Sequence, residues 1–247
     1  MESLFSGDSP TLSRFRVLSK SIRNKSLTRA LQYEMLLDLP NLGRILDVGG
    51  GDQADYLSLI KFDHYDSINI DPAIAPTWVV NVGEEFPLDS ETYDAVLSMN
   101  TLEHVFDPNF VIGEMYRVLR PGGELVISTP FLYPIHGHPD DFFRPTPSWY
   151  QQTLERTGFH RAEIVALAWG PRSTRLTCAG SGRFGSGLQK QYALLFDLFD
   201  AKMRNLVHRP LGAAYWQRLA TAFFVRARKP SRASTAKGAM SSETNAK

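Results

Sequence analysis

Apolar residues recur at helical spacing near the start of the chain. Between residues 11 and 38 they fall three or four positions apart around an irregular middle, and Pro40 with Asn41 ends the pattern. The apolar positions are Leu12, Phe15, Leu18, Ile22, Leu31, Met35 and Leu39. This spacing predicts an N-terminal helical extension within residues 1–40.

Short apolar or β-branched runs then alternate with helical segments. The runs are "RILDVG", "SINID", "TWVVN", "YDAVLSM", "ELVIST" and "AEIVALAW". Such alternation is typical of a mostly parallel sheet with helices on both faces. One helix is expected to begin at Asp107 and Pro108, an N-cap and first-turn pair, and to end before "RPGG" at residues 120–123. We therefore predict an α/β fold.

The pattern changes towards the end of the chain. Residues 170–187 are rich in Gly, Ser and Arg, which predicts a loop, and Leu188 to Leu206 then follow an amphipathic helical pattern. The run "ATAFFVRARK" predicts a final strand, and the small, polar residues after it predict a disordered tail. The expected boundaries are 41–229 for the main domain, 170–215 for a loop and helix insertion within it, and 230–247 for the tail.

Composition narrows the classes of partner. The 247 residues are 43% hydrophobic, which is enough for a real core, and the net charge of +1 gives no general attraction to nucleic acid. The single cysteine, Cys178, excludes an internal disulfide, and we find neither a signal peptide nor an apolar run long enough to span a bilayer. We expect a cytoplasmic protein. Residues 11–33 carry basic and no acidic side chains, so peripheral membrane contact stays open beside an ordinary solvated face.

A run of glycines follows the first strand, in "ILDVGGGDQADYL". Glycine permits backbone angles forbidden to other residues and lets backbone N–H groups approach a ligand closely. Gly49, Gly51 and Ala54 match the relaxed dinucleotide fingerprint, and Asp71 ends the next strand, where an acid can bind ribose hydroxyls. The segment predicts an adenosine-containing cofactor. Asp47, before the glycines, would repel a pyrophosphate but can help hold a cationic cofactor.

Four motifs follow one another with characteristic spacing. They are "LDVGGG", "NIDP", "FPLDSETYDAVLSMNTLEHV" and "RVLRPGGELVISTP". Their succession resembles the Rossmann-like S-adenosylmethionine-dependent methyltransferases, over about residues 42–168. The resemblance implies a seven-stranded, mostly parallel sheet with helices on both faces and a reversed last hairpin. The chain departs from the family's usual pattern at Gly50, where cysteine or another small residue is common, and at Asn81, where aspartate is usual.

The resemblance also implies which residues hold S-adenosylmethionine. It places Asp47, Gly49, Gly51 and Asn100 around the methionine end of the cofactor. It places Asp71 at the ribose hydroxyls, and Asn81 with Val82 beside the adenine. The amide of Asn81 can still form hydrogen bonds with adenine. We therefore expect that asparagine in place of the usual aspartate changes the affinity for the cofactor but does not abolish binding. His104, in "LEHV", is shared by many related methyltransferases, and we expect it to be structural.

The stretch "HGHPDDFFRPTP", residues 136–147, concentrates functional groups after the strand "ELVIST". Ligands bind at the carboxyl edge of open α/β sheets, so this stretch lies where an acceptor would bind. His136 or His138 can act as a general base oriented by Asp140 or Asp141, and Arg144 can hold an anionic substrate group. Two other interpretations remain open. In one, Asp140 or Asp141 pairs with Arg144 and the loop is rigid and without chemistry; in the other, two histidines and a carboxylate form a metal site, although we expect no metal.

The same stretch resembles a methyltransferase subgroup associated with glycan tailoring. The matching residues are His136, Pro139, Asp141, Phe142, Arg144 and Thr146. The resemblance implies methylation of a small molecule or glycan, most simply at oxygen, with no nucleic acid as partner. The alternatives are an NAD(P)-dependent oxidoreductase and a catalytically inactive module that binds S-adenosylmethionine. Neither the acceptor nor the oligomeric state follows from the sequence.

Overall fold

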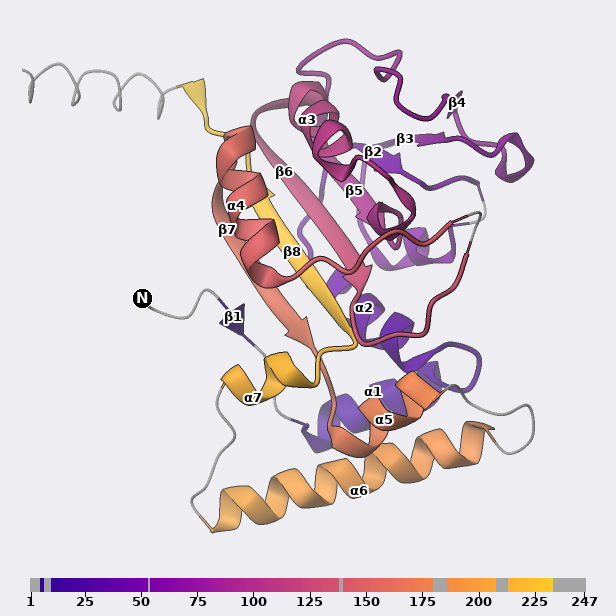
Figure 1. The fold of residues 1–247 in the computed structure, drawn as a ribbon, viewed down its shortest axis with the longest axis vertical. Coiled ribbons are helices and arrows are strands. Elements are labelled where there is room, and N and C mark those ends of the chain that lie inside the picture. Colours follow the sequence, from indigo (N-terminus) through magenta and orange to yellow (C-terminus); the bar gives the residue numbers. More distant parts are fainter. Residues whose placement is uncertain are drawn as a thin grey trace, which may run out of the picture.

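A sheet of eight strands forms the centre of the protein, in the order β1-β7-β8-β6-β5-β2-β3-β4. The structure is a computed structural model and describes residues 5–6, 10–52, 54–137, 140–179, 186–207 and 213–232 (Figure 1). The strands are β1 (Phe5–Ser6), β2 (Arg44–Val48), β3 (His64–Asn69), β4 (Trp78–Val79), β5 (Tyr93–Met99), β6 (Leu119–Pro130), β7 (His160–Leu167) and β8 (Ala222–Arg228). Only β8 runs antiparallel to its neighbours. The predicted α/β sheet with a reversed last hairpin is confirmed, and the short β1 extends it by one edge strand.

Successive residues of each strand contribute their side chains to two separate hydrophobic cores, one on each face of the sheet. In β2, Ile45 belongs to one cluster of buried side chains and Leu46 to the other. This alternation arises because neighbouring side chains of a strand point to opposite faces. Helices α1 (Leu12–Ser21), α2 (Leu27–Leu36) and α6 (Ser186–Leu206) contribute to the first cluster, whereas α3 (Pro108–Val118) and α4 (Pro147–Thr157) contribute to the second. The fold therefore has three layers, with the sheet in the middle.

The N-terminal helix is interrupted where the sequence shows only an irregular middle. Two helices form instead, because Thr11 and Ser26 each cap one of them: the hydroxyl of Ser26 accepts from the backbone N–H of Arg29 at 3.1 Å. Leu18 and Ile22 are buried as expected, but Leu12 is exposed. The irregular middle of the pattern therefore corresponds to the break between α1 and α2.

The stretch from residue 170 contains a helix where a loop was predicted. Helix α5 spans Pro171–Ala179, and residues 180–185 lie outside the described part. The Asp197 carboxylate, from α6, accepts the backbone N–H groups of Arg172 at 3.1 Å and Ser173 at 2.9 Å. A carboxylate at a helix N-terminus satisfies N–H groups that have no partner within the helix. The cap comes from a distant segment, so composition alone did not indicate the helix.

Other local predictions are close to the observed boundaries. The Asp107 carboxylate accepts the Phe110 N–H at 3.1 Å at the start of α3, as expected of an N-cap. Strand β6 begins earlier than "ELVIST" and includes "RPGG". After the glycines the chain forms a short 3-10 helix, η1 (Asp55–Leu59). Two further 3-10 helices are η2 (Pro72–Ile74) and η3 (Leu102–His104), and the last helix is α7 (Ala213–Arg218).

The connections leaving the sheet diverge between β2 and β5. From β2 the chain proceeds to β3 and β4 on one side, and from β5 to β6 on the other. Such a switch point leaves a crevice at the carboxyl ends of the strands, where ligands bind in open α/β folds. Within the described residues, no helix is sufficiently long and apolar to cross a membrane. Most of the predicted tail lies outside the described residues.

Candidate active site

A cavity of about 830 Å³ opens at this switch point. Its walls come from the carboxyl ends of β2, β3 and β5 and from the segments that follow them. The predicted cofactor residues that line it are Gly49, Asp71, Asn81, Val82 and Asn100. Apolar side chains, among them Ile68, Val80 and Phe86, complete the wall. A cleft of this size and character is suited to a nucleoside-bearing small molecule.

The turn after β2 needs glycine at position 49. Gly49 has φ of +93°, and a Cβ there would overlap the side chain of Thr101. Its N–H donates to the Ile68 carbonyl at 2.8 Å, and its carbonyl accepts from the Asn69 side chain at 2.7 Å. Because the end of β3 holds the turn through both hydrogen bonds, the backbone of the turn is fixed at the cavity wall.

Asp47 lies beneath the turn and is not among the described residues that line the cavity. Its carboxylate is fully buried and accepts hydrogen bonds from the hydroxyls of Tyr56 and Tyr65. Burial raises the pKa of Asp47 to about 6, although both tyrosine hydrogen bonds oppose the shift. One oxygen, Oδ1, has no partner within the described residues. The expected contact of Asp47 with a cofactor therefore stays a prediction.

Gly51 is required by packing as well. A Cβ at this position would meet the backbone oxygen of Ile74 at 2.5 Å, and the Gly51 carbonyl accepts from the Tyr65 hydroxyl at 3.1 Å. The glycine thus lets the turn pack against η2. Like Asp47, it is not among the described cavity-lining residues.

Asp71 stands at the cavity after β3. Its carboxylate accepts the Ala73 N–H at 2.8 Å, and its own N–H donates to the Asn69 side chain at 3.0 Å. A carboxylate can accept further hydrogen bonds, so one capping bond leaves capacity for ligand hydroxyls. Beside it, Val82 is exposed and Asn81 donates to the Glu84 carboxylate at 2.9 Å.

Asn100 is held by a residue that the sequence did not single out. Asn100 and Gln32 exchange side-chain hydrogen bonds of 2.6 and 3.1 Å, and Gln32 also donates to the Ser128 hydroxyl at 3.0 Å. Asn100 has φ of +56°, a left-handed conformation that asparagine tolerates better than most residues. Helix α2 therefore fixes the cavity wall at the end of β5.

In the predicted loop after β6, which the sequence suggests as the acceptor side, Asp141 is the central residue. It accepts the His136 backbone N–H at 2.9 Å, lies 3.3 Å from His136 Nδ1, and accepts two hydrogen bonds from the Arg144 guanidinium. Arg144 holds the pKa of Asp141 down to about 2. The structure thus brings His136, Asp141 and Arg144 together, whereas His138 lies outside the described residues. Asp140 contributes its backbone oxygen, which contacts the His104 ring.

Glu103 adds a buried carboxylate to this side. It is fully buried in the middle of η3, and neither side-chain oxygen has a hydrogen-bond partner within the described residues. Burial raises the pKa of Glu103 to about 8, and the residue's own backbone N–H and the positive charge of Arg144 oppose this shift. Glu103, His104 and His136 each offer one ligand atom within 4.8 Å of the others. The signal in the sequence was the "EH" pair, but its distance from His136 along the chain hid the cluster.

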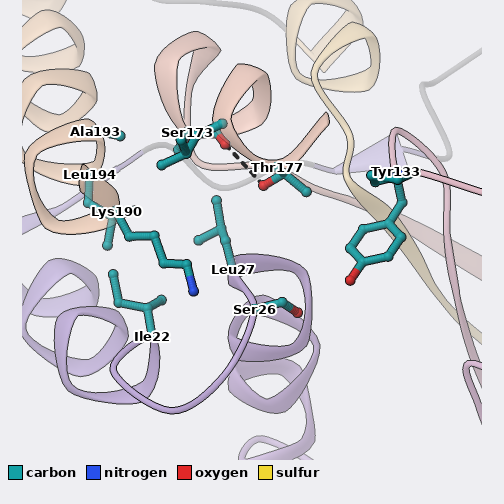
Figure 2. A pocket seen from close by; sticks show the side chains of 11 residues that line it. Ile22, Ser26, Leu27, Tyr133, Ser173, Thr177, Lys190, Ala193 and Leu194 are labelled. Carbon is teal, nitrogen blue, oxygen red and sulfur yellow. Dashed lines mark hydrogen bonds between the residues drawn. The ribbon is translucent and has the colours of Figure 1, made fainter. Parts of the chain in front are cut away.

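A second cavity, of about 110 Å³, lies between the connection from α1 to α2, helix α5 and helix α6 (Figure 2). Tyr133 and Pro134, from the acceptor segment, line it together with apolar side chains such as Leu27 and Leu194 and the ammonium-bearing Lys190. The Tyr133 ring also contacts the His136 ring, with centroids 5.2 Å apart. Tyr133 therefore connects the acceptor segment with the helical layer.

Comparison with known proteins points to one class of domain. Residues 46–127 match the family described as methyltransferase domain. This part of the chain is similar to a methyltransferase domain. A tRNA U34 carboxymethyltransferase of Methylococcus capsulatus is 29% identical over 152 residues, which cover 51% of this chain and 47% of that relative. The chain thus spans about half the length of that relative.

Solved structures support the fold. A methyltransferase bound to the Trm112 methyltransferase activator of Haloferax volcanii matches with a TM-score of 0.53 and 16% identity, over 88% of this chain and 94% of that one. Phosphoethanolamine N-methyltransferase 2 of Haemonchus contortus, solved with phosphomonomethylethanolamine and S-adenosylhomocysteine, matches with a TM-score of 0.51 and 17% identity, over 81% and 52% of the two chains. At such identities the likeness shows a shared Rossmann-like fold.

Proposed function

We propose that the protein is an S-adenosylmethionine-dependent methyltransferase that methylates a hydroxyl of a small molecule or glycan. The observation that carries this proposal is the cavity at the switch point, with Gly49 and Asp71 in its wall and the His136 segment beside it. Gly137, the neighbour of His136, also lines the cavity. The similarity of residues 46–127 to a methyltransferase domain supports the same conclusion.

The residues of the cavity fit the proposed cofactor. Asp71 can accept hydrogen bonds from ribose hydroxyls, while Asn81 and Val82 offer an amide and an apolar surface for adenine. Gly49 and Asn100 lie at the ends of β2 and β5, where the methionine end would be held. When bound, S-adenosylmethionine supplies a methyl group that its sulfonium already activates. The Haemonchus contortus enzyme, solved with S-adenosylhomocysteine, has the same fold.

The chain itself has to position the acceptor and handle its proton. As the acceptor oxygen forms its new bond to carbon, the sulfur–carbon bond breaks and the acceptor O–H must lose its proton. His136 is the candidate base, since Asp141 holds its backbone and lies next to Nδ1. Phe106 and Phe142, whose ring centroids are 5.5 Å apart, can cover the site against water.

We propose for Arg144 a role other than holding an anionic substrate group. Its guanidinium is engaged with Asp141 and also donates to the Phe143 carbonyl at 3.0 Å. A guanidinium that already forms a bidentate pair has little left for a substrate anion. We therefore propose that Arg144 positions Asp141 and, through it, His136.

Labelled methyl transfer tests the proposed acceptor class. The full chain is incubated with S-adenosylmethionine carrying a labelled methyl group and, separately, with oligosaccharides, small alcohols and phenols, and unmodified tRNA. The proposal predicts label on a hydroxyl-bearing sugar or small molecule, in a linkage that resists mild base. Label on tRNA alone, the acceptor class named for the Methylococcus relative, would contradict the acceptor assignment. Hydride transfer with NAD(P) would instead indicate an oxidoreductase, and cofactor binding without any transfer an inactive module.

We also propose that the α1 and α6 layer contacts an anionic membrane surface and that the protein acts in the cytoplasm. Helix α6 exposes a row of apolar side chains, namely Leu188, Tyr192, Leu195, Phe196, Phe199, Met203 and Leu206. Helix α1 packs against α6 and has no acidic residue in its first turn, while Arg16, Lys20 and Arg23 are exposed on or next to it. Apolar and basic side chains together favour the surface of anionic lipid.

Sedimentation with lipid vesicles tests the membrane contact. The chain should bind vesicles that contain phosphatidylserine, release them at high salt, and lose binding in Phe199→Glu. Equal sedimentation with neutral vesicles would contradict the proposal. A concentration-dependent dimer abolished by Phe199→Glu would assign the apolar row to self-association instead.

A further inference from the structure

Glu103 and His104, from η3, meet His136, from the loop after β6, beside the main cavity. Each offers one ligand atom within 4.8 Å of the others, and His104 lines the cavity itself. The two imidazole rings stand edge to face with centroids 5.1 Å apart. We propose that these three side chains bind a divalent transition-metal ion at the acceptor end of the cavity.

The buried carboxylate of Glu103 is the strongest support. The side chain is 0% exposed, and both of its oxygens lack a hydrogen-bond partner within the described residues. A buried polar group without a partner is costly, and an ion is one of the few things that explains it. The guanidinium of Arg144 donates its hydrogen bonds to Asp141 and forms none with Glu103.

One ring nitrogen of each histidine already contacts a carbonyl or carboxylate oxygen, as is common for histidines that bind metal. His104 Nδ1 contacts the backbone oxygen of Asp140, while its Nε2 lies 3.8 Å from Glu103 Oε1. In His136 the Nδ1 side faces Asp141 and the Pro134 carbonyl, each at 3.3 Å, which leaves Nε2 for another partner. Ligating histidines commonly donate their other ring N–H to a carbonyl or carboxylate, which fixes tautomer and orientation. Both rings therefore have the outer contacts that metal binding needs.

The ligand types select the class of ion. Two imidazole nitrogens and one carboxylate oxygen suit Mn²⁺, Fe²⁺, Co²⁺ or Zn²⁺ better than Mg²⁺ or Ca²⁺, which prefer oxygen alone. Bonds of about 2.1 Å place ligand atoms roughly 3–3.5 Å apart, so the cluster has to contract by about an ångström on binding. His136 is partly exposed and stands on a loop, so it can make this movement.

The metal site would complete the acceptor side of the cavity. Three protein ligands leave coordination positions open, as in catalytic rather than structural sites. Insofar as the proposed function holds, an acceptor hydroxyl at these positions loses its proton more readily, and the proton passes to solvent. His136 then acts as a ligand in place of a base.

Cobalt absorption measures the proposed site directly. The full chain without a polyhistidine tag is freed of metal by a chelator and titrated with Co²⁺ while the visible d–d bands are recorded. We expect saturation near one equivalent, competition by Zn²⁺ and little competition by Mg²⁺. Glu103→Gln, which keeps the side-chain size, and His136→Asn should each weaken Co²⁺ binding at least tenfold. Circular dichroism confirms that the variants are folded.

His64→Gln is the matched control, since His64 is a half-exposed histidine that contacts Asp66 away from the cavity. It should bind Co²⁺ like the parent chain. Absence of saturable bands, or equal affinity in Glu103→Gln, His136→Asn and the parent, would overturn the proposal. Calorimetry with S-adenosylmethionine on the metal-free chain separates the two hypotheses: cofactor binding without Co²⁺ binding overturns only the metal site, and the reverse result overturns only the proposed cofactor.

Discussion

The two sides of the candidate site are constructed differently. The cofactor side consists of strand ends and the turns after them, and backbone contacts such as Gly49 N–H to the Ile68 carbonyl fix it. The acceptor side is a long segment between β6 and α4, held by side-chain contacts centred on Asp141. Changes on the first side should therefore alter stability and cofactor affinity, whereas changes on the second should alter turnover. The following variants test that division, from the largest expected effect to the smallest.

Gly49→Ala should have the largest effect on stability. The substitution places a Cβ in a left-handed backbone conformation and against Thr101, so we expect a loss above about 3 kcal/mol. Gly122→Ala is the matched control, because Gly122 has φ of +86° but open space around a Cβ. It should lose only about 1–2 kcal/mol in urea unfolding. Equal losses in both variants would mean that Thr101 does not hold the turn.

Asp47→Asn should change how stability depends on pH. The folded pKa of about 6 lies above the ordinary value of 3.8. Below pH 4 the carboxyl group is protonated in both the folded and the unfolded chain, so it does not lower the free energy of unfolding. As the pH rises from 4 towards 6, the unfolded chain ionises first, and the folded state is left with a penalty of about 3 kcal/mol at pH 7. The amide variant should lack this slope and be more stable than the parent at neutral pH. Parallel pH profiles in urea unfolding would show that Asp47 is not responsible.

His136→Ala should lower turnover about 10²-fold, or about 2.7 kcal/mol, whether the ring is a base or a metal ligand. Affinity for S-adenosylmethionine should change less than twofold, because the ring belongs to the acceptor side. Steady-state kinetics and calorimetry measure the two quantities. His64→Ala should leave both unchanged. A weaker cofactor affinity in His136→Ala would break the distinction between the two sides.

Gln32→Leu should destabilise the fold by about 2 kcal/mol, because the Asn100 amide and the Ser128 hydroxyl lose a buried partner. Cofactor affinity should fall only a few fold, through the loosened Asn100. Gln151→Leu, which removes an exposed bond to Glu155, should cost less than about 0.5 kcal/mol. If both glutamine variants unfold alike, α2 does not fix the cavity wall.

The sequence predicted the cofactor side far better than the acceptor side. Gly49 and Asp71 each follow a strand that is recognisable in the sequence from its apolar run. Because these two strands pair in parallel, both residues lie at the same edge of the sheet. Gln32 was missed because its partner Asn100 is distant in the chain and no local pattern marks it. The burial of Glu103 and the capping of α5 by Asp197 likewise depend on tertiary contacts. Arg144 and Asp141, in contrast, are only three residues apart, and their pairing was one of the interpretations that the sequence left open. The hydrophobic pattern indicates where strands end, but it does not indicate which polar side chains from different loops come into contact.

Calorimetry with S-adenosylmethionine and with NAD, on the parent chain and on Asp71→Ala, tests the central claim most directly. We expect that S-adenosylmethionine binds at one site per chain, that NAD does not bind, and that Asp71→Ala weakens binding tenfold or more, about 1.4 kcal/mol. Binding of NAD alone, or unchanged affinity for S-adenosylmethionine in Asp71→Ala, would contradict it.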